Sequence, residues 1–132
     1  MSSGTNAYGE GREPIPALDQ PTVIFMINKS LPKETRSAQQ VYDATRRSWV
    51  IGERARERAV YALGVSHGVV RGAFRIDRWY LEGGNRWRFE GVAAPELAHV
   101  VDTSIERIKA RQGNSSPVRY FLDGIAAPTD PS

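Results

Sequence analysis

The chain has 132 residues, of which 40% are hydrophobic and 25% are charged, a composition typical of one globular domain that can bury its own core. It contains no cysteine, which excludes disulfides, thiolate metal sites and cysteine nucleophiles. No apolar run approaches the about 20 residues of a membrane-spanning helix, and the first residues lack the basic and apolar regions of a signal peptide. We therefore expect a cytoplasmic protein without a membrane partner.

Positive charge is concentrated in the middle of the chain. The net charge is +3 overall but +6 over residues 36–88, which hold eleven of the fifteen arginines and five acidic residues. Arginine presents a planar fork of donors that fits phosphate and stacks on bases, and such a segment is typical of an anion-binding surface. A GC-rich genome also enriches arginine, so this bias has a second explanation.

The predicted domain covers residues 21–125. Residues 1–20 are rich in Gly, Pro, Ser and Glu without periodicity, and they predict a loosely held tail, as do residues 126–132. The β-branched run at 22–27 predicts a buried strand.

A helical pattern follows the first predicted strand. Ser37 can cap a helix that begins at Ala38, and its apolar stripe extends to Trp49, with Gly52 ending or breaking the helix. Residues 53–59 predict a second short helix or an exposed loop.

Strand-like runs with two intervening turns come next. They cover 60–65, 69–76, 79–81 and 86–92, with turns at 66–68 and 82–85. In the second run, alternation predicts one face on the core and one face carrying Arg71 and Arg75 into solvent. In the last run, Trp87 and Phe89 share one face.

The end of the predicted domain contains one helix and one strand. Pro95 fits the first position of a helix whose apolar stripe extends to Ile108 and which ends at Gly113. Residues 117–122 predict a closing strand. Strands in hairpins with helical excursions indicate an α+β fold with a curved, mainly antiparallel sheet.

Few residues could carry metal or catalytic chemistry. The two histidines, His67 and His99, stand on a predicted turn and a predicted helix without cysteine, and predict no metal site. No phosphate-cradling glycine loop, nucleophile elbow or carboxylate pair is recognisable. The sequence therefore predicts no catalytic residue and no cofactor.

Aromatic side chains are interleaved with the arginines. They are Trp49, Tyr61, Trp79, Tyr80 and Trp87. Stacking a base on an aromatic face contributes about 1–3 kcal/mol. Tryptophans of a small domain more commonly pack in its core, but we expect at least one of the three tryptophans to line a site.

The arrangement resembles a group of short bacterial domains over residues 23–121. The shared positions include Ile27, Asn28, Ser30, Ala44, Thr45, Arg46, Trp49, Gly52, Arg54, Pro117, Val118, Arg119 and Tyr120. The layout is also similar to PUA-like domains of the EVE and ASCH kind, which are small curved β-barrels flanked by helices. That similarity implies recognition of RNA or of a modified DNA base in an aromatic pocket. It places Trp49, Arg54 and Trp79 around this pocket with Asn28 and Ser30.

These observations predict an α+β domain, with a small curved sheet or PUA-like barrel and two to three flanking helices, that binds nucleic acid without catalysis. The predicted ligand-binding residues are Asn28, Ser30, Thr45, Arg46, Trp49, Arg54, Trp79 and Arg119. The predicted phosphate contacts are Arg47, Arg56, Arg71, Arg75 and Arg88.

Two alternative functions remain open from the sequence. A small enzyme acting on a nucleotide-like or other anionic molecule would use polar residues at element ends, namely Asn28, Lys29, Thr45, Arg46 and Arg119. A protein-interaction or regulatory module would instead capture its partner through the tail at residues 1–20. The sequence does not predict an oligomeric state.

Overall fold

The structure is a computed structural model that describes residues 12–28, 37–108 and 116–128. Its named elements are β1 (Thr22–Met26), α1 (Ala38–Arg46), β2 (Arg47–Val50), α2 (Glu53–Arg58), β3 (Tyr61–Ser66), β4 (Val69–Gly83), β5 (Arg86–Ala93), the 3-10 helix η1 (Pro95–Val100) and β6 (Val118–Phe121).

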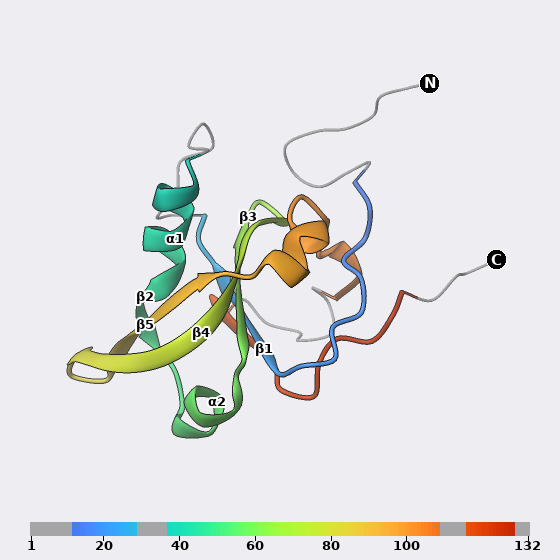
Figure 1. Ribbon diagram of the computed structural model, residues 1–132. Coiled ribbons are helices and arrows are strands. Elements are labelled where there is room, and N and C mark those ends of the chain that lie inside the picture. The colour runs from blue at the N-terminus through green and yellow to red at the C-terminus, as the bar shows by residue number, and fades with distance from the viewer. Residues whose placement is uncertain (1–11, 29–36, 109–115, 129–132) are drawn as a thin grey trace.

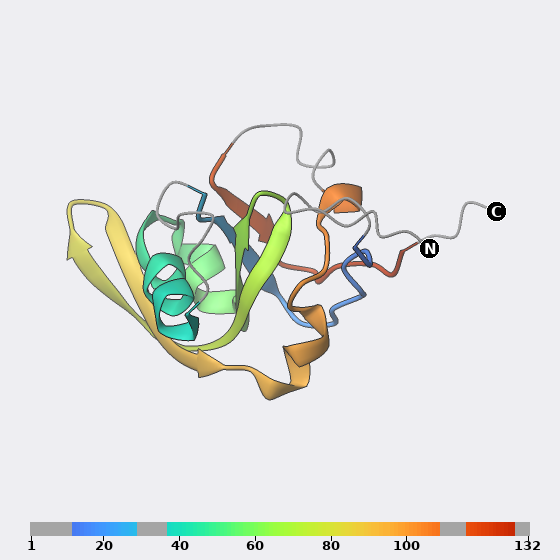
Figure 2. The ribbon, with the colours of Figure 1, turned by 90° about the horizontal axis from the view of Figure 1, so that it is seen from above.

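The strands form one curled, mixed sheet (Figure 1). Their order across the sheet is β2-β5-β4-β3-β1-β6, and among the paired strands only β1 and β3 run parallel. A parallel pair requires a crossover connection, and this one contains α1, β2 and α2. Figure 2 shows β4 and β5 curling around α1. The predicted α+β class with a curved, mainly antiparallel sheet is confirmed.

Two hydrophobic cores share the strands of the sheet. We name the first the helix core, and its buried residues are Val23, Phe25, Ile27, Val41, Ile51, Ala55, Ala62, Phe74, Phe89 and Val118. We name the second the terminal core, and its buried residues are Ile15, Leu18, Ile24, Leu63, Val65, Val70, Ala73, Ala94, Leu97, Val100, Ile105, Ile108 and Ile125. Successive strand residues face opposite sides, so β1 contributes to both cores. This double burial explains its uninterrupted apolar run.

The long strand β4 carries part of the sheet beyond the terminal core, so that this part packs against the helix core alone. Its first half pairs with β3, while the part beyond the bulge after Ile76 pairs with β5 alone, and β2 pairs with the other side of β5. We name β2, residues 77–83 of β4 and residues 86–90 of β5 the extension. It projects to the left in Figure 1.

The first helix is shorter than predicted, and the strand after it was not predicted. The cap is as expected, since the Ser37 Oγ accepts a hydrogen bond from the Gln40 N–H at 3.1 Å. The helix ends at Arg46, however, and β2 follows at once. Tryptophan and valine favour strands, and pairing with β5 prevails over the helical spacing. The Trp49 Nε1 then donates to the Thr45 carbonyl at 2.7 Å, which satisfies an orphan acceptor at the helix end.

The long helix predicted after Pro95 is wrong beyond η1. Asp102 adopts a left-handed conformation with φ 77°, which no right-handed helix can accommodate. Ser104 then forms bridges with Pro14 and Val69. These backbone pairings divide the apolar stripe between η1 and a separate helical segment whose described residues are 106–108. The predicted end at Gly113 lies outside the described residues.

The expectation of a loose tail does not hold for residues 12–20. Ile15 and Leu18 are buried in the terminal core, and Leu18 pairs with Ile125 near the C-terminus. Spaced apolar residues between prolines have no strand or helix period, so the sequence pattern missed this contribution. Residues 1–11 lie outside the described part of the chain.

Candidate nucleic-acid interface

The outer face of the extension brings several arginines together. In the strand register Arg47 lies opposite Arg88, which lies opposite Tyr80, so the three side chains form a row across β2, β5 and β4. Residues two positions apart in a strand share a face. This face, which we name the arginine face, therefore comprises Arg47, Val50, Arg78, Tyr80, Glu82, Arg86, Arg88 and Glu90.

The Glu82 carboxylate forms ion pairs with two arginines at the centre of the arginine face. The Glu82 Oε2 lies 3.2 Å from the Arg47 Nη2 and 3.6 Å from the Arg88 Nη1. The Arg88 guanidinium also lies over the Tyr80 ring, 4.8 Å from its centroid. The Glu82 side chain is only 14% exposed. One negative charge against two positive charges leaves this centre cationic.

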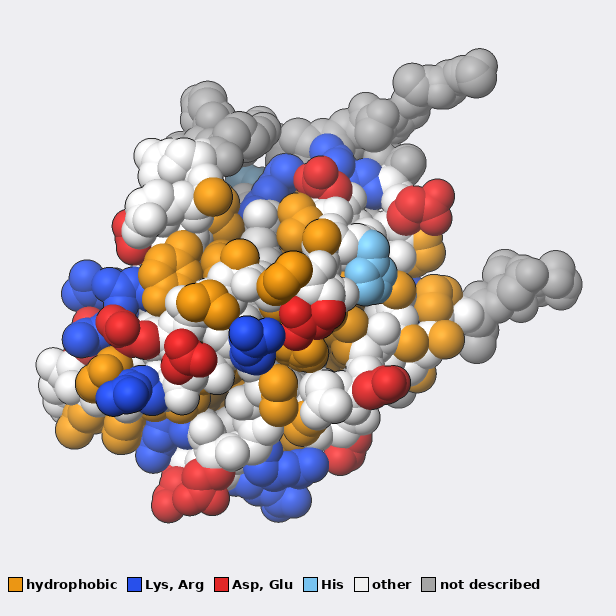
Figure 3. Space-filling view, viewed as in Figure 1, with side chains coloured by type: hydrophobic (Ala, Val, Ile, Leu, Met, Phe, Trp, Pro, Cys, Tyr) orange, Lys and Arg blue, Asp and Glu red, His pale blue; other side chains and the backbone are white. Residues whose placement is uncertain are grey.

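The remaining arginines of this face add to the surplus. The Arg86 Nη1 donates to the Ser48 carbonyl at 3.0 Å, a neutral partner, and Arg78 is exposed and forms no ion pair with a described residue. Glu90 is paired with Arg46 of α1 at 3.5 Å. Figure 3 shows basic and acidic side chains side by side over this end of the molecule.

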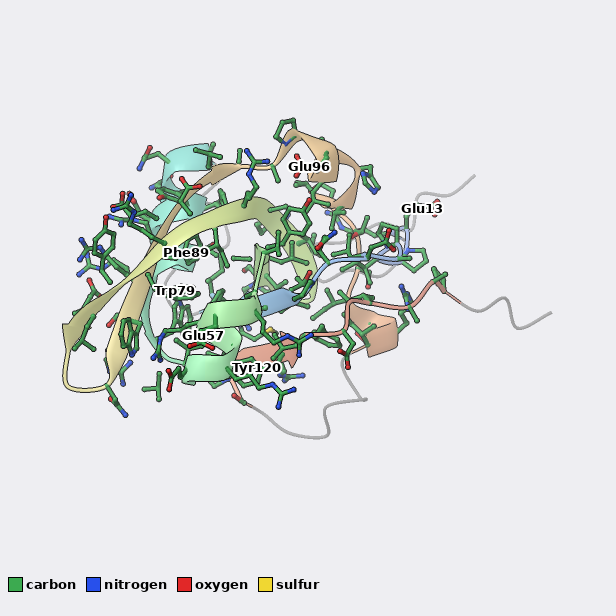
Figure 4. The ribbon with its side chains drawn as sticks, turned by 60° about the horizontal axis from the view of Figure 1, so that its bottom comes forward. Glu13, Glu57, Trp79, Phe89, Glu96 and Tyr120 are labelled. Carbon is green, nitrogen blue, oxygen red and sulfur yellow. The ribbon has the colours of Figure 1, made fainter. Side chains whose placement is uncertain are left out.

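The tryptophans lie on the inner side of the extension, against the helix core. Trp49 stacks on Phe25 with centroids 4.9 Å apart. Trp79 packs edge-on against Phe89 at 5.5 Å (Figure 4). The Arg56 guanidinium covers Trp87 at 3.7 Å. All three rings are partly buried, and each has one face or edge packed against a protein group.

Several predicted ligand residues have partners within the protein. Thr45 is fully buried, and its Oγ1 donates to the Val41 carbonyl at 2.7 Å. Asn28 accepts a hydrogen bond from the His67 N–H at 2.8 Å, which ties the β3–β4 turn to the end of β1. Arg119 is 9% exposed and lies on β6, at the opposite edge of the sheet from β2.

Two predicted phosphate contacts form ion pairs with the segment after β5. Arg71 pairs with Asp102 at 3.8 Å, and Arg75 pairs with Glu96 of η1 at 3.3 Å. The Tyr61 hydroxyl donates to the same Glu96 carboxylate at 2.7 Å. This hydrogen bond lowers the pKa of Glu96 and raises the pKa of Tyr61.

The structure therefore groups part of the predicted set and disperses the rest. It gathers Arg46, Arg47 and Arg88 at the extension, and it leaves Arg54 exposed on α2. Ser30 and Lys29 lie outside the described residues. The predicted site sets lack Arg78, Arg86 and Glu82, and Tyr80 was named only among the interleaved aromatic residues. The reason is that β2 was not predicted, so the row across three strands could not be assembled from the sequence.

Two hollows of the described part lie away from the arginine face. One, of about 670 Å³, lies between the N-terminal segment, β6 and residues 122–127. The other, of about 340 Å³, is an apolar groove between α1, β4 and η1. Within the described residues no group of three or more His, Cys, Asp or Glu gathers to hold a metal ion.

Among residues 12–28, 37–108 and 116–128, no helix has the length and hydrophobicity needed to cross a membrane. No family model, curated protein or solved structure matches the chain.

Proposed function

We propose that this chain is a cytoplasmic, non-enzymatic nucleic-acid-binding module and that a single strand lies along the arginine face. The observation that carries the proposal is the row of Arg47, Arg88 and Tyr80 across three adjacent strands. Among the residues that the structure describes, the Ser48 carbonyl is the only partner of Arg86, which lies on the same face. Guanidinium groups bind phosphate oxygens through two parallel hydrogen bonds, so this surface suits a chain of phosphodiesters.

The shape of the surface favours a strand over a single extruded base. The tryptophan rings that would enclose a base are packed against Phe25, Phe89 and Arg56. The Arg88 guanidinium over Tyr80, by contrast, offers a flat cationic platform at the surface. Bases of single strands stack on such planes, and the contact tolerates any sequence.

Fluorescence anisotropy with labelled single-stranded RNA, single-stranded DNA, and duplex DNA with and without methylated cytosine tests the proposal. We expect the single strands to bind most tightly and their affinity to fall steeply with salt. Arg86→Ala should weaken binding to all sequences alike and reduce the slope of log K against log salt by about 0.7.

Arg58→Ala is the matched control. Arg58 is also an exposed arginine, but it lies on α2 and contacts the Leu122 carbonyl and Asp123. Its loss should leave the salt slope unchanged. Absence of binding by the wild-type protein at low salt, or an equal loss in both variants, would contradict the proposal.

A further inference from the structure

We infer that Arg47 and Arg88 form a binding site for one phosphodiester group, and that the Glu82 carboxylate holds the place of this phosphate in the free protein. The inference rests on the proposed function and identifies the centre of that surface. The same carboxylate oxygen contacts both guanidinium groups, at 3.2 Å and 3.6 Å, so both already converge on one anionic oxygen.

The pairing with Glu82 leaves hydrogen-bonding capacity unused. The Glu82 Oε1 and the Arg88 Nε are both buried, and neither has a hydrogen-bond partner within the described part of the chain. Buried polar groups without partners are costly. A phosphodiester oxygen that approached the Arg88 Nε would satisfy this donor, which the carboxylate does not.

The location of Glu82 allows the exchange. It precedes the Gly83-Gly84 turn of the β4–β5 hairpin, where both glycines have positive φ, and glycine permits local rearrangement at little steric cost. Once displaced, its carboxylate can move into solvent beyond the hairpin end. Binding of a strand must therefore replace the two ion pairs that Glu82 forms with Arg47 and Arg88.

Removing the carboxylate should consequently tighten binding. Glu82→Gln keeps the shape of the side chain and removes its charge. We expect it to raise the affinity for labelled single-stranded RNA by about two- to thirtyfold, the range for two ion pairs of this kind. Glu82→Thr, a substitution that suits a strand, should also raise this affinity. Circular dichroism melting establishes that both variants fold.

Glu90→Gln is the matched control, because Glu90 lies on the same face but pairs with Arg46. It removes the same charge without freeing Arg47 or Arg88, and should change affinity much less. Two results would overturn this inference and leave the proposed function standing, provided that the wild type binds. In the first, Glu82→Gln does not raise the affinity; in the second, Glu90→Gln raises it equally. Absence of binding by the wild type and both Glu82 variants overturns both.

Discussion

At the scale of single residues, Thr45 shows that a polar residue predicted to contact a ligand can also have a packing role. It stands in a helix beside an arginine and near a tryptophan, a setting that predicts recognition. Its hydroxyl instead bonds within α1 and fills the space above Gly64 of β3, where an added Cβ would lie 2.1 Å from the Thr45 Oγ1. The threonine and the glycine thus fit helix α1 closely against the sheet.

Gly64→Ala should therefore destabilise the protein by about 1–3 kcal/mol, the usual cost of overpacking. Urea denaturation measures this difference. Thr45→Ala in the same chain removes the clashing oxygen, so the double variant should be more stable than the sum of the single changes predicts. Additive losses would show that the two residues do not share this space.

The ion-pair partners of the arginines are likewise not evident from the sequence. Counting charges along the sequence predicts a basic surface, but it cannot show which carboxylates lie beside which guanidinium groups. Arg71 and Arg75 contact Asp102 and Glu96. On the extension, Arg86 bonds the neutral Ser48 carbonyl, and Arg88 shares the single carboxylate of Glu82 with Arg47. The charge surplus, not the number of arginines, identifies the candidate surface.

At the scale of elements, η1 is attached to the sheet by a small polar network. The Glu96 carboxylate of η1 accepts hydrogen bonds from Tyr61 of β3 and Arg75 of β4. The hydrogen bond from Tyr61 is the largest cause of the lowered pKa of Glu96. Since η1 contributes Leu97 and Val100 to the terminal core, the network positions part of that core.

A lowered carboxyl pKa fixes the sign of the pH dependence. The stabilisation is fully present above the ordinary pKa of a glutamate and is lost as the pH falls through the lowered pKa of the folded protein. In Tyr61→Phe the pKa of Glu96 should rise towards its ordinary value. NMR titration of the Glu96 carboxyl carbon measures this change. Tyr80→Phe removes a hydroxyl from the arginine face instead, and it should leave the Glu96 titration unchanged. An unaltered Glu96 titration in Tyr61→Phe would contradict the network.

The elements that sequence predicted best are those specified locally. β1 follows from an apolar run. The β3–β4 hairpin follows from a turn at His67-Gly68, whose positive φ values of 52° and 79° suit a type I′ turn. β2 was missed, and the helix predicted from Pro95 was too long, because distant pairings decide both. The β2 strand exists through β5, and bridges at Ser104 interrupt the predicted helix.

At the scale of the whole molecule, the sheet separates the hydrophobic cores from the arginine face. The first half of β4 and its neighbours lie between the helix core and the terminal core. The extension leaves this double layer, so its inner face packs on the helix core while its outer face carries the arginines. This division depends on the parallel β1–β3 pairing and the crossover between them, which no local pattern predicts. The candidate surface could not be assembled from sequence for the same reason.

The most direct test of the account is an NMR titration of the labelled protein with single-stranded RNA at low salt, following backbone amides and arginine Nε–H signals. We expect the largest shifts at Arg47, Tyr80, Arg86 and Arg88, with little change at Arg119 on the opposite edge of the sheet. Shifts centred on β6 or on the groove between α1 and η1, or no shifts at all, would contradict the assignment of the arginine face as the binding surface.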